Sequence, residues 1–290
     1  MPKQKLVYIW SLRNAAADQA GKYVTYKSEQ RYMKSPLEHL VEQLNNTELG
    51  ELYSLEAIIH DDDKNYERDR ERLGQYDFTP SSTGDWFFPL NMSVRGKKVT
   101  ELMESIPSSY RSLPMDSPER PIGKHHFEQS LLDRLIELEA DLVMLDGLIV
   151  ILDELIRPGS LFYRKVVNIH PGITRIESPY ERRGATATLD ALYGARGQKI
   201  LDWQTMATES VSPLYKTGAS FHYVDNGIDS GEVIADALNT DIHPDDTILE
   251  LRWNNFQLSL FPAMIHGLKL MVQGENVAIT DDRLVAKCED

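Results

Sequence analysis

Two short apolar segments with an amphipathic helix between them constrain the fold more than any other feature of this sequence. Residues 6–10 and residues 52–59 are apolar runs with the length of buried strands. Between them, Ser35-Pro36-Leu37-Glu38 has the pattern of a helix N-terminus, with serine as the N-cap, proline in the first turn and glutamate three residues after the cap. Apolar residues follow at helical spacing, at Leu37, Leu40, Val41 and Leu44. Because a strand–helix–strand unit joins parallel strands through a right-handed crossover, the sequence predicts an α/β fold.

The same two kinds of element continue in the second half of the chain. One more helical face is formed by Phe127, Leu131, Leu135 and Leu138. Strands are expected at residues 142–145, 166–169, 219–224 and 233–238, and helices at residues 186–193 and 247–271. Pro262 lies inside the last helix and should kink it.

Residues 61–121 interrupt this regular pattern. The charged run that starts at Asp61-Asp62-Asp63 is interpreted as a solvated segment, and His60 beside it adds too few convergent ligands for a metal site. Proline, serine and glycine are frequent farther on, but four aromatic residues predict an ordered insertion packed on the body: Trp86, Phe87, Phe88 and Tyr110. With a second insertion at residues 196–216, we predict one domain that spans residues 1–290.

Charge and hydropathy exclude several classes of function. Acidic residues outnumber basic ones by 45 to 31, for a net charge of −14, whereas nucleic-acid binding depends on basic patches. No apolar run approaches the ~18 residues of a membrane span, and the N-terminal residues lack the apolar core of a signal peptide. The single cysteine, Cys288, has no partner for an internal disulfide. We therefore expect a cytoplasmic protein with no nucleic-acid or membrane partner, and the oligomeric state stays open.

Two segments carry residues suited to acyl transfer onto nitrogen. Asn168-Ile169-His170 ends an apolar strand, where open parallel sheets place their ligands, and a later strand leads into a loop that contains Asp229. A side-chain amide can stabilise an oxyanion, an imidazole titrates near neutral pH, and a carboxylate influences the charge of that imidazole. Together these three groups can transfer an acyl group to nitrogen without a covalent enzyme intermediate.

The two segments together resemble the 10-formyltetrahydrofolate-dependent formyltransferases, the family of glycinamide ribonucleotide transformylase and methionyl-tRNA formyltransferase. The resemblance covers residues 141–272 and implies a Rossmann-like fold, with a mostly parallel, twisted sheet, helices on both faces and insertions. It also implies that N10-formyltetrahydrofolate is the formyl donor, that no metal takes part, and that Asn168, His170 and Asp229 are catalytic. His222 matches the second histidine of the family, and its role, in the site or in the structure, stays open.

The same resemblance assigns the donor pocket to two loops. The residues that it assigns to donor contacts are Leu148, Val150, Leu152, Asp225, Asn226 and Ile228. Many family members have arginine at the position of Val150, so the contact expected here is made by the backbone. Gly227 would permit a positive φ in the turn that faces the pterin ring.

The residues that follow the first strand limit the kinds of acceptor that the enzyme could use. Residues 10–18 contain no Gly-x-Gly cradle, which argues against a ribonucleotide acceptor and against the dinucleotide fingerprint of Rossmann oxidoreductases. The chain also leaves no room for the C-terminal domain of methionyl-tRNA formyltransferases. Residues 5–14 and 30–37, with the long insertion, are similar to the N5-hydroxyornithine transformylases of pyoverdine siderophore biosynthesis, and this similarity extends over essentially the full length.

This last resemblance implies a small-molecule acceptor, N5-hydroxyornithine, whose hydroxylamine nitrogen would become part of a hydroxamate. Four arginines are candidates for binding its carboxylate: Arg13, Arg31, Arg182 and Arg183. Three alternatives stay open. They are formylation of another small amine such as glycinamide ribonucleotide or an amino sugar, hydrolysis of formyltetrahydrofolate, and a folate-binding module with a decayed site.

Overall fold

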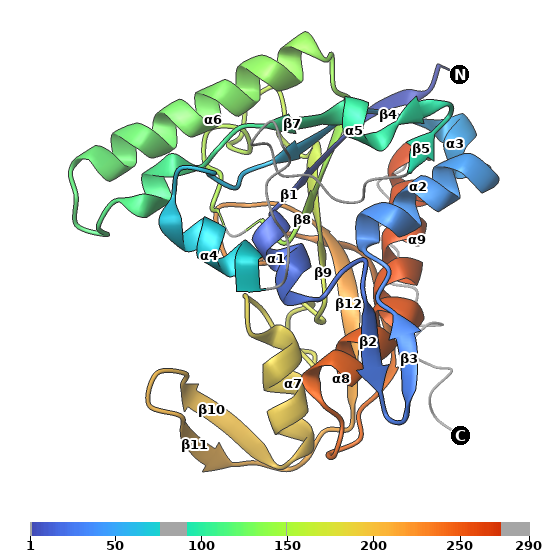
Figure 1. Cartoon of the computed structure of the whole chain (residues 1–290), viewed down its shortest axis with the longest axis vertical. Helices are drawn as coiled ribbons and strands as arrows, with labels where there is room; N and C mark the ends of the chain where they lie inside the picture. The colour runs from blue at the N-terminus through green and yellow to red at the C-terminus, as the bar shows by residue number, and fades with distance from the viewer. Residues whose placement is uncertain (1, 76–91, 149, 274–290) are drawn as a thin grey trace.

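The computed structural model describes residues 2–75, 92–148 and 150–273, and in these ranges a seven-stranded sheet runs through the centre of the molecule (Figure 1). The strand order is β13-β12-β9-β8-β1-β4-β7. These strands are β1 (Gln4–Trp10), β4 (Tyr53–His60), β7 (Met103–Ser105), β8 (Leu142–Asp146), β9 (Val166–His170), β12 (Lys216–Tyr223) and β13 (Val233–Asp241). From β7 to β9 neighbouring strands are parallel, whereas β12 is antiparallel to both β9 and β13. The predicted α/β fold with a mostly parallel sheet is confirmed.

Helices cover both faces of this sheet (Figure 1). On one face, α6 (Glu119–Glu137) buries Phe127, Leu131 and Leu135. On the other face lie α2 (Pro36–Asn46) and α9 (Phe261–Val272). The capping box predicted for α2 is present, because Ser35 Oγ accepts the Glu38 N–H at 3.1 Å and Glu38 Oε2 accepts the Ser35 N–H at 2.8 Å. Both layers of the core therefore follow from apolar periodicity that is visible in the sequence.

The C-terminal helical segment is interrupted just before Pro262. It consists of α8 (Ile248–Asn255), a π-helical turn at Phe256–Leu260, and α9. Pro262 has no N–H for the carbonyl oxygen of Leu258, four residues earlier. That oxygen instead accepts a hydrogen bond from Asn239 Nδ2 of β13 at 3.3 Å. The irregularity expected at the proline is therefore present as a widened turn, and β13 compensates for the missing hydrogen bond.

Several connections contain structure that the sequence did not reveal. A hairpin of β2 (Tyr23–Tyr26) and β3 (Glu29–Tyr32) occupies the polar link after β1, and β7, inside residues 61–121, adds a strand to the edge of the main sheet. A second hairpin, β10 (Gln198–Asp202) with β11 (Ala207–Ser210), lies within residues 196–216. The other elements are α1 (Leu12–Ala17), α3 (Leu49–Leu52), α4 (Glu67–Gln75), β5 (Ser93–Val94), β6 (Lys97–Lys98), α5 (Val99–Leu102), a 3₁₀ turn at Ser109–Ser112 and α7 (Ala187–Ala195).

Some of the residues singled out in the sequence fall outside the described ranges. Trp86, Phe87, Phe88 and Cys288 do so. Tyr110, the fourth aromatic residue of the long insertion, is buried against Phe127 of α6, with ring centroids 5.9 Å apart. In the ranges that the structure describes, no helix has the length and apolar character needed to cross a membrane.

Candidate active site

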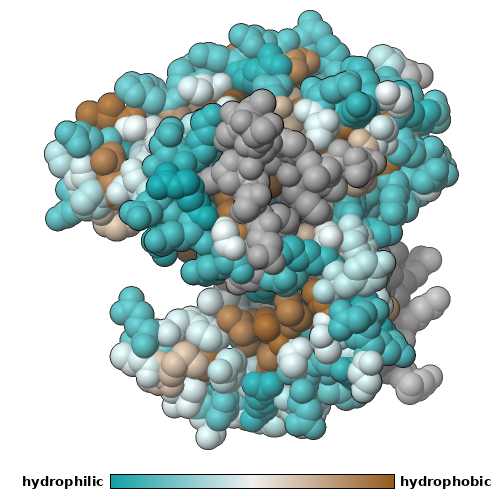
Figure 2. Space-filling view, viewed as in Figure 1, coloured by the Kyte–Doolittle hydropathy of each residue, from teal (hydrophilic) through white to brown (hydrophobic). Residues whose placement is uncertain are grey.

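A cavity of about 650 Å³ opens at the C-terminal edge of the parallel strands. It is lined by the ends of β8, β9 and β12 and by residues of α1, α7 and α8. Figure 2 shows apolar surface in the hollow between the upper part of the molecule and the part that contains α7 and α8. All three predicted catalytic residues line this cavity: Asn168, His170 and Asp229.

The carboxylate of Asp229 bridges the other two predicted catalytic residues. Asn168 Nδ2 donates to Asp229 Oδ1 at 3.1 Å, and His170 Nδ1 lies 3.3 Å from Asp229 Oδ2. The Nε2 atom of His170 lies 3.0 Å from the carbonyl oxygen of Arg182. Both imidazole nitrogens therefore face oxygen acceptors, and only the protonated ring has an N–H donor for each of them.

The backbone places Asp229 by a strained conformation and one hydrogen bond. Asp229 has a φ of 46°, in the left-handed region, and its Oδ2 accepts the N–H of Gly184 at 2.8 Å. Gly227, where a positive φ was expected, does not have one; a Cβ there would lie 2.0 Å from Ser230 Oγ, so close packing is what requires glycine. A positive φ at a residue other than glycine, as at Asp229, is concentrated at functional sites in proteins.

His222 belongs to the same cluster. It pairs with Asn168 across β9 and β12, and its Nε2 lies 3.3 Å from Asn168 Nδ2 and 3.5 Å from Asp229 Oδ1. Its Nδ1 lies 2.8 Å from the carbonyl oxygen of Tyr223. The side chain is only 2% exposed, yet it lines the cavity. His222 therefore packs behind Asn168 and Asp229 and is also part of the cavity wall.

Burial and the neighbouring groups shift the pKa values of Asp229 and His170. Burial by itself would raise the pKa of Asp229, but the hydrogen bond with His222, the charge of His170 and the Gly184 N–H together lower it to about 2. Burial also lowers the pKa of His170, and the Asp229 carboxylate opposes this effect without cancelling it. The sequence suggested that Asp229 keeps His170 protonated. In the free protein this effect is too weak, because desolvation of the ring lowers the pKa of His170 more than the Asp229 carboxylate raises it.

The residues assigned to the donor are only partly gathered at the cavity. Leu148, Val150, Asp225 and Ile228 line it. Leu152 is fully buried in the core beneath α6, and the Asn226 side chain is not part of the lining. Asp225 Oδ1 accepts from Ser230 Oγ at 2.6 Å and from the Gly227 N–H at 3.1 Å, which shapes the loop that carries Asp229.

This side of the cavity is mainly apolar. Its lining side chains are Leu145, Leu148, Val150, Ile151, Val224 and Ile228. A flat aromatic ring fits such a wall, because apolar side chains cover its faces while nearby backbone groups meet its polar edge.

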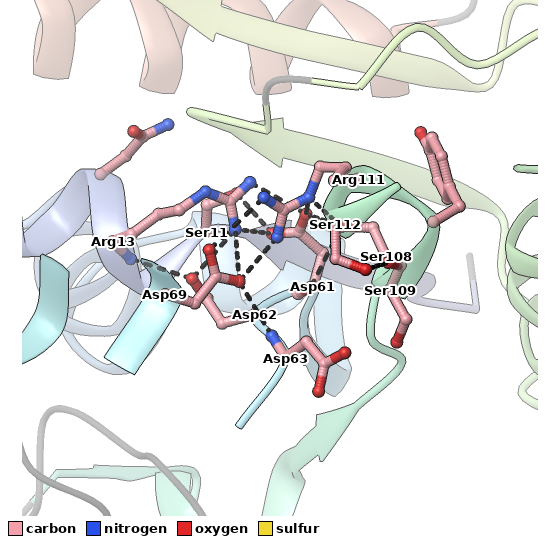
Figure 3. A network of polar contacts seen from close by, with 12 residues as sticks. Ser11, Arg13, Asp61, Asp62, Asp63, Asp69, Ser108, Ser109, Arg111 and Ser112 are labelled. Carbon is pink, nitrogen blue, oxygen red and sulfur yellow. Dashed lines mark hydrogen bonds and ion pairs between the residues drawn. The ribbon is translucent and has the colours of Figure 1, made fainter. Parts of the chain in front are cut away.

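A buried charge network lies behind the first turn after β1 (Figure 3). Asp61 and Asp62 are each only 1% exposed, so the prediction of a solvated segment is wrong at these positions. The reason is pairing. The Arg13 guanidinium donates to both carboxylates at 3.0 Å, while Ser108 Oγ donates to Asp61 at 2.6 Å and Arg111 Nε lies 3.6 Å from it.

The network also occupies the backbone N–H groups that follow β1. Asp62 accepts from the N–H of Leu12 at 2.6 Å and from that of Arg13 at 3.2 Å. A carboxylate of the chain therefore sits where an anionic group of a ligand would otherwise bind, in agreement with the missing phosphate cradle. Arg13 is committed to these aspartates and does not line the cavity, and neither do the other arginines proposed for the acceptor: Arg31, Arg182 and Arg183.

Four charged residues that the sequence analysis did not select line the cavity: Asp18, Arg72, Asp146 and Arg252. Asp146 ends β8 just as His170 ends β9, so a polar residue at the end of an apolar strand was a signal that could have identified it. Asp18 and Arg252 form an ion pair of 2.7 Å between distant parts of the chain, which no local pattern announces. In the described part of the chain no group of three or more histidine, cysteine or acidic side chains could hold a metal ion.

Comparisons with known proteins agree with this geometry. No protein-family model matches the chain. A solved structure of PvdF of pyoverdin biosynthesis, an N10-formyltetrahydrofolate-dependent formyltransferase, is 59% identical, with a TM-score of 0.87 over 93% of this chain and 99% of that chain.

Two more distant structures show the fold alone. Phosphoribosylglycinamide formyltransferase from Anaplasma phagocytophilum is 17% identical, with a TM-score of 0.51 over 94% of this chain and 88% of that chain. Glycinamide ribonucleotide transformylase 1 from Symbiobacterium toebii is 15% identical, with a TM-score of 0.52 over 94% of this chain and 89% of that chain. The high identity with PvdF over nearly the whole length confirms the predicted enzyme class and formyl donor: the chain belongs to the N10-formyltetrahydrofolate-dependent formyltransferases.

Proposed function

We propose that this enzyme transfers the formyl group of N10-formyltetrahydrofolate to the hydroxylamine nitrogen of N5-hydroxyornithine and so makes a hydroxamate for pyoverdine biosynthesis. The observation that carries this proposal is the 59% identity, over 93% of the chain, with PvdF of pyoverdin biosynthesis. The acidic network after β1 supports it, because it fills the position at which a phosphate-bearing acceptor would be bound.

In this proposal Asn168, His170 and Asp229 carry the chemistry. The hydroxylamine nitrogen attacks the formyl carbon, the bond from that carbon to N10 breaks, and the proton of the attacking nitrogen is transferred to N10. Asn168 would donate an N–H to the formyl oxygen as negative charge develops there, and His170 would stabilise the same charge. Asp229 would orient both side chains and favour the charged imidazole at that moment, since its carboxylate contacts each of them.

The residues along the apolar wall would hold the donor. Leu148, Val150 and Ile228 would cover the pterin ring, and the loop of Asp225 would meet its polar edge. Because Leu152 and Asn226 do not present side chains to the cavity, any contact from them would come from the backbone.

A hydroxylamine acceptor suits a site of this kind. It is less basic than an alkyl amine, so it is a neutral nucleophile at physiological pH, whereas the side-chain amine of ornithine must first lose a proton. A site that hydrogen-bonds the N-hydroxyl can discriminate against an acceptor without it by ~10⁴ or more. The compartment that we propose for the reaction is the cytoplasm, which cell fractionation would test.

A competition between acceptors tests the proposal. Purified protein would be incubated with N10-formyltetrahydrofolate and N5-hydroxyornithine, ornithine or glycinamide ribonucleotide, and the gain of one formyl group would be followed by mass spectrometry. We expect N5-hydroxyornithine to react far faster than the other two. Equal or faster turnover of either one would refute this acceptor, and rapid release of formate without any acceptor would indicate a hydrolase.

A further inference from the structure

The cavity has a second, charged side whose residues have no role so far. Asp18, Asp146, Arg72 and Arg252 line it, from the ends of α1 and β8 and from α4 and α8. The register of the sheet determines on which face Asp146 lies. Leu145 pairs with Asn168 and Asp146 with Ile169, so Asp146 lies on the sheet face opposite to Asn168. Asn168 thus shares a sheet face with Leu145 of the apolar wall, and Asp146 enters the same cavity from the other face of the sheet.

Asp146 is a half-buried carboxylate at the end of β8. Its Oδ2 accepts a hydrogen bond from the buried Tyr8 hydroxyl at 2.5 Å. No lysine, arginine or histidine within residues 2–75, 92–148 and 150–273 forms an ion pair with it. Burial, with a contribution from nearby Asp18, raises the pKa of Asp146 to about 7. A half-buried carboxylate that faces a cavity under these conditions gains from a positively charged ligand.

The neighbouring charges differ from Asp146 because they are already paired. Arg252 Nη1 lies 2.7 Å from Asp18 Oδ1 and donates to the carbonyl oxygen of Ala17 at 3.1 Å. Both contacts use the same guanidinium nitrogen, so the other edge of the guanidinium keeps donors for a second acceptor. Asp146 therefore has no ion pair among the described residues, and Arg252 keeps donors for a ligand on this side of the cavity.

We propose that Asp146 binds the α-ammonium group of the acceptor and that Arg252 binds its α-carboxylate. This assignment rests on the proposed function, because it takes the acceptor to be a free amino acid. Asp146 and Asn168 line the same cavity from the ends of adjacent strands but from opposite faces of the sheet, so an acceptor that reaches both must extend past the strand ends, as the three-methylene side chain of ornithine would. The head group would then be held at β8, and the hydroxylamine nitrogen would extend toward β9.

The assignment predicts how the enzyme responds to a missing ammonium group. The test compares N5-hydroxyornithine with 5-(hydroxyamino)pentanoate, which differs only by the absence of the α-amino group, in the wild type and in Asp146→Asn. In the wild type, we expect KM for the truncated acceptor to be about 10- to 100-fold higher, the typical effect of losing a hydrogen bond between charged groups. Asp146→Asn should raise KM for N5-hydroxyornithine by a similar factor, treat both acceptors alike and bind the formyl donor normally.

Two controls keep the result interpretable. Asp133→Asn makes the same change of charge at an exposed position on α6, where the carboxylate accepts only from Gln129, and should leave both KM values unchanged. Asparagine at position 146 retains an oxygen for the Tyr8 hydroxyl, which favours normal folding. If that variant nevertheless fails to fold, the comparison of the two acceptors on the wild type decides alone.

The outcomes separate this assignment from the proposed function. Equal KM values for the two acceptors on a wild type that formylates N5-hydroxyornithine would overturn the assignment and leave the proposed function standing. A wild type that formylates neither acceptor would overturn both. A matching test with a decarboxylated acceptor, N-hydroxyputrescine, should show a loss that Arg252→Gln abolishes, and an unchanged KM on the wild type would overturn the role of Arg252.

Discussion

Replacing Arg13 by methionine should destabilise the whole fold, because the guanidinium lies at the centre of the buried network in Figure 3. Arg13 donates to Asp61 with both Nη atoms at 3.0 Å and to Asp62 at 3.0 Å. Arg13 is 9% exposed and each of these aspartates is 1% exposed, so water cannot replace the lost donors. Methionine has a similar length but no charge, and it would leave two buried carboxylates with Arg111 as the remaining cation.

The expected loss is large. Removing one partner of a buried ion pair costs about 3–5 kcal/mol, since the remaining charge stays buried and unpaired. For a chain of 290 residues, whose unfolding entropy is about 0.6 kcal/mol/K, that loss corresponds to a fall in Tm of about 5–8 °C. Arg13→Lys, which keeps the charge but cannot form the two-pronged contact with Asp61, should cost less.

The loss of unfolding free energy in Arg13→Met should also depend on pH, and it should decrease as the pH falls. Burial would raise the pKa of Asp61, but Arg13, Arg111 and Ser108 lower it below its ordinary value. A carboxylate with a lowered pKa in the folded state contributes stability above its unfolded pKa of about 3.9 and loses that contribution as the pH falls through the folded value. The gap between wild type and Arg13→Met should therefore be widest near neutral pH and should narrow on acidification.

Urea and thermal unfolding of wild type, Arg13→Met and Arg13→Lys at pH 7 and at about pH 3, below the unfolded pKa of aspartate, measure this prediction. The reasoning is refuted if Arg13→Met loses less than ~1 kcal/mol at pH 7, the range of an exposed ion pair. It is also refuted if acid widens the gap between the two proteins.

Three further predictions concern the site and the packing behind it. Asn168→Ala and His170→Ala should each lower kcat, by about 10²–10³ where one oxyanion donor is lost, while donor affinity measured by calorimetry changes little; near-normal turnover would contradict the assignment. Asp229→Asn should lower the pKa of His170 further, because the carboxylate partly offsets the effect of burial, and an NMR titration of the histidines that showed no change would remove this role. Gly267→Ala should lower the unfolding free energy by about 1–3 kcal/mol, since a Cβ there would lie 2.1 Å from Phe221 Cδ1, and an unchanged Tm would show that α9 yields freely.

The positions of the proposed catalytic residues could be found because the family resemblance agrees with a local rule. Asn168 and His170 come at the end of an apolar strand, and parallel strands bring their carboxyl ends to one edge of the sheet. The same kind of rule located the capping box at Ser35 and the irregular turn before Pro262, since each depends on residues within one or two helical turns.

The hairpins and the charged residues were harder to predict. The β2–β3 hairpin has only short strands with one buried side chain in every two residues of β2, so its alternation is too brief to stand out. The segment that begins at Asp61 has the composition of a solvated surface, and only the packing of β1 beside β4 brings Arg13 against it.

By itself, therefore, the sequence determined most strands of the main sheet, the helices that cover it with their apolar faces, and the polar residues that stand at the ends of β8 and β9. The tertiary structure alone decided which charges meet: it pairs Asp61 with Arg13 and Asp18 with Arg252, and gives Asp146 no ion pair among the described residues. The physical reason is that periodicity acts over a few residues, whereas the energy of a buried charge depends on partners supplied by distant elements once they have packed together.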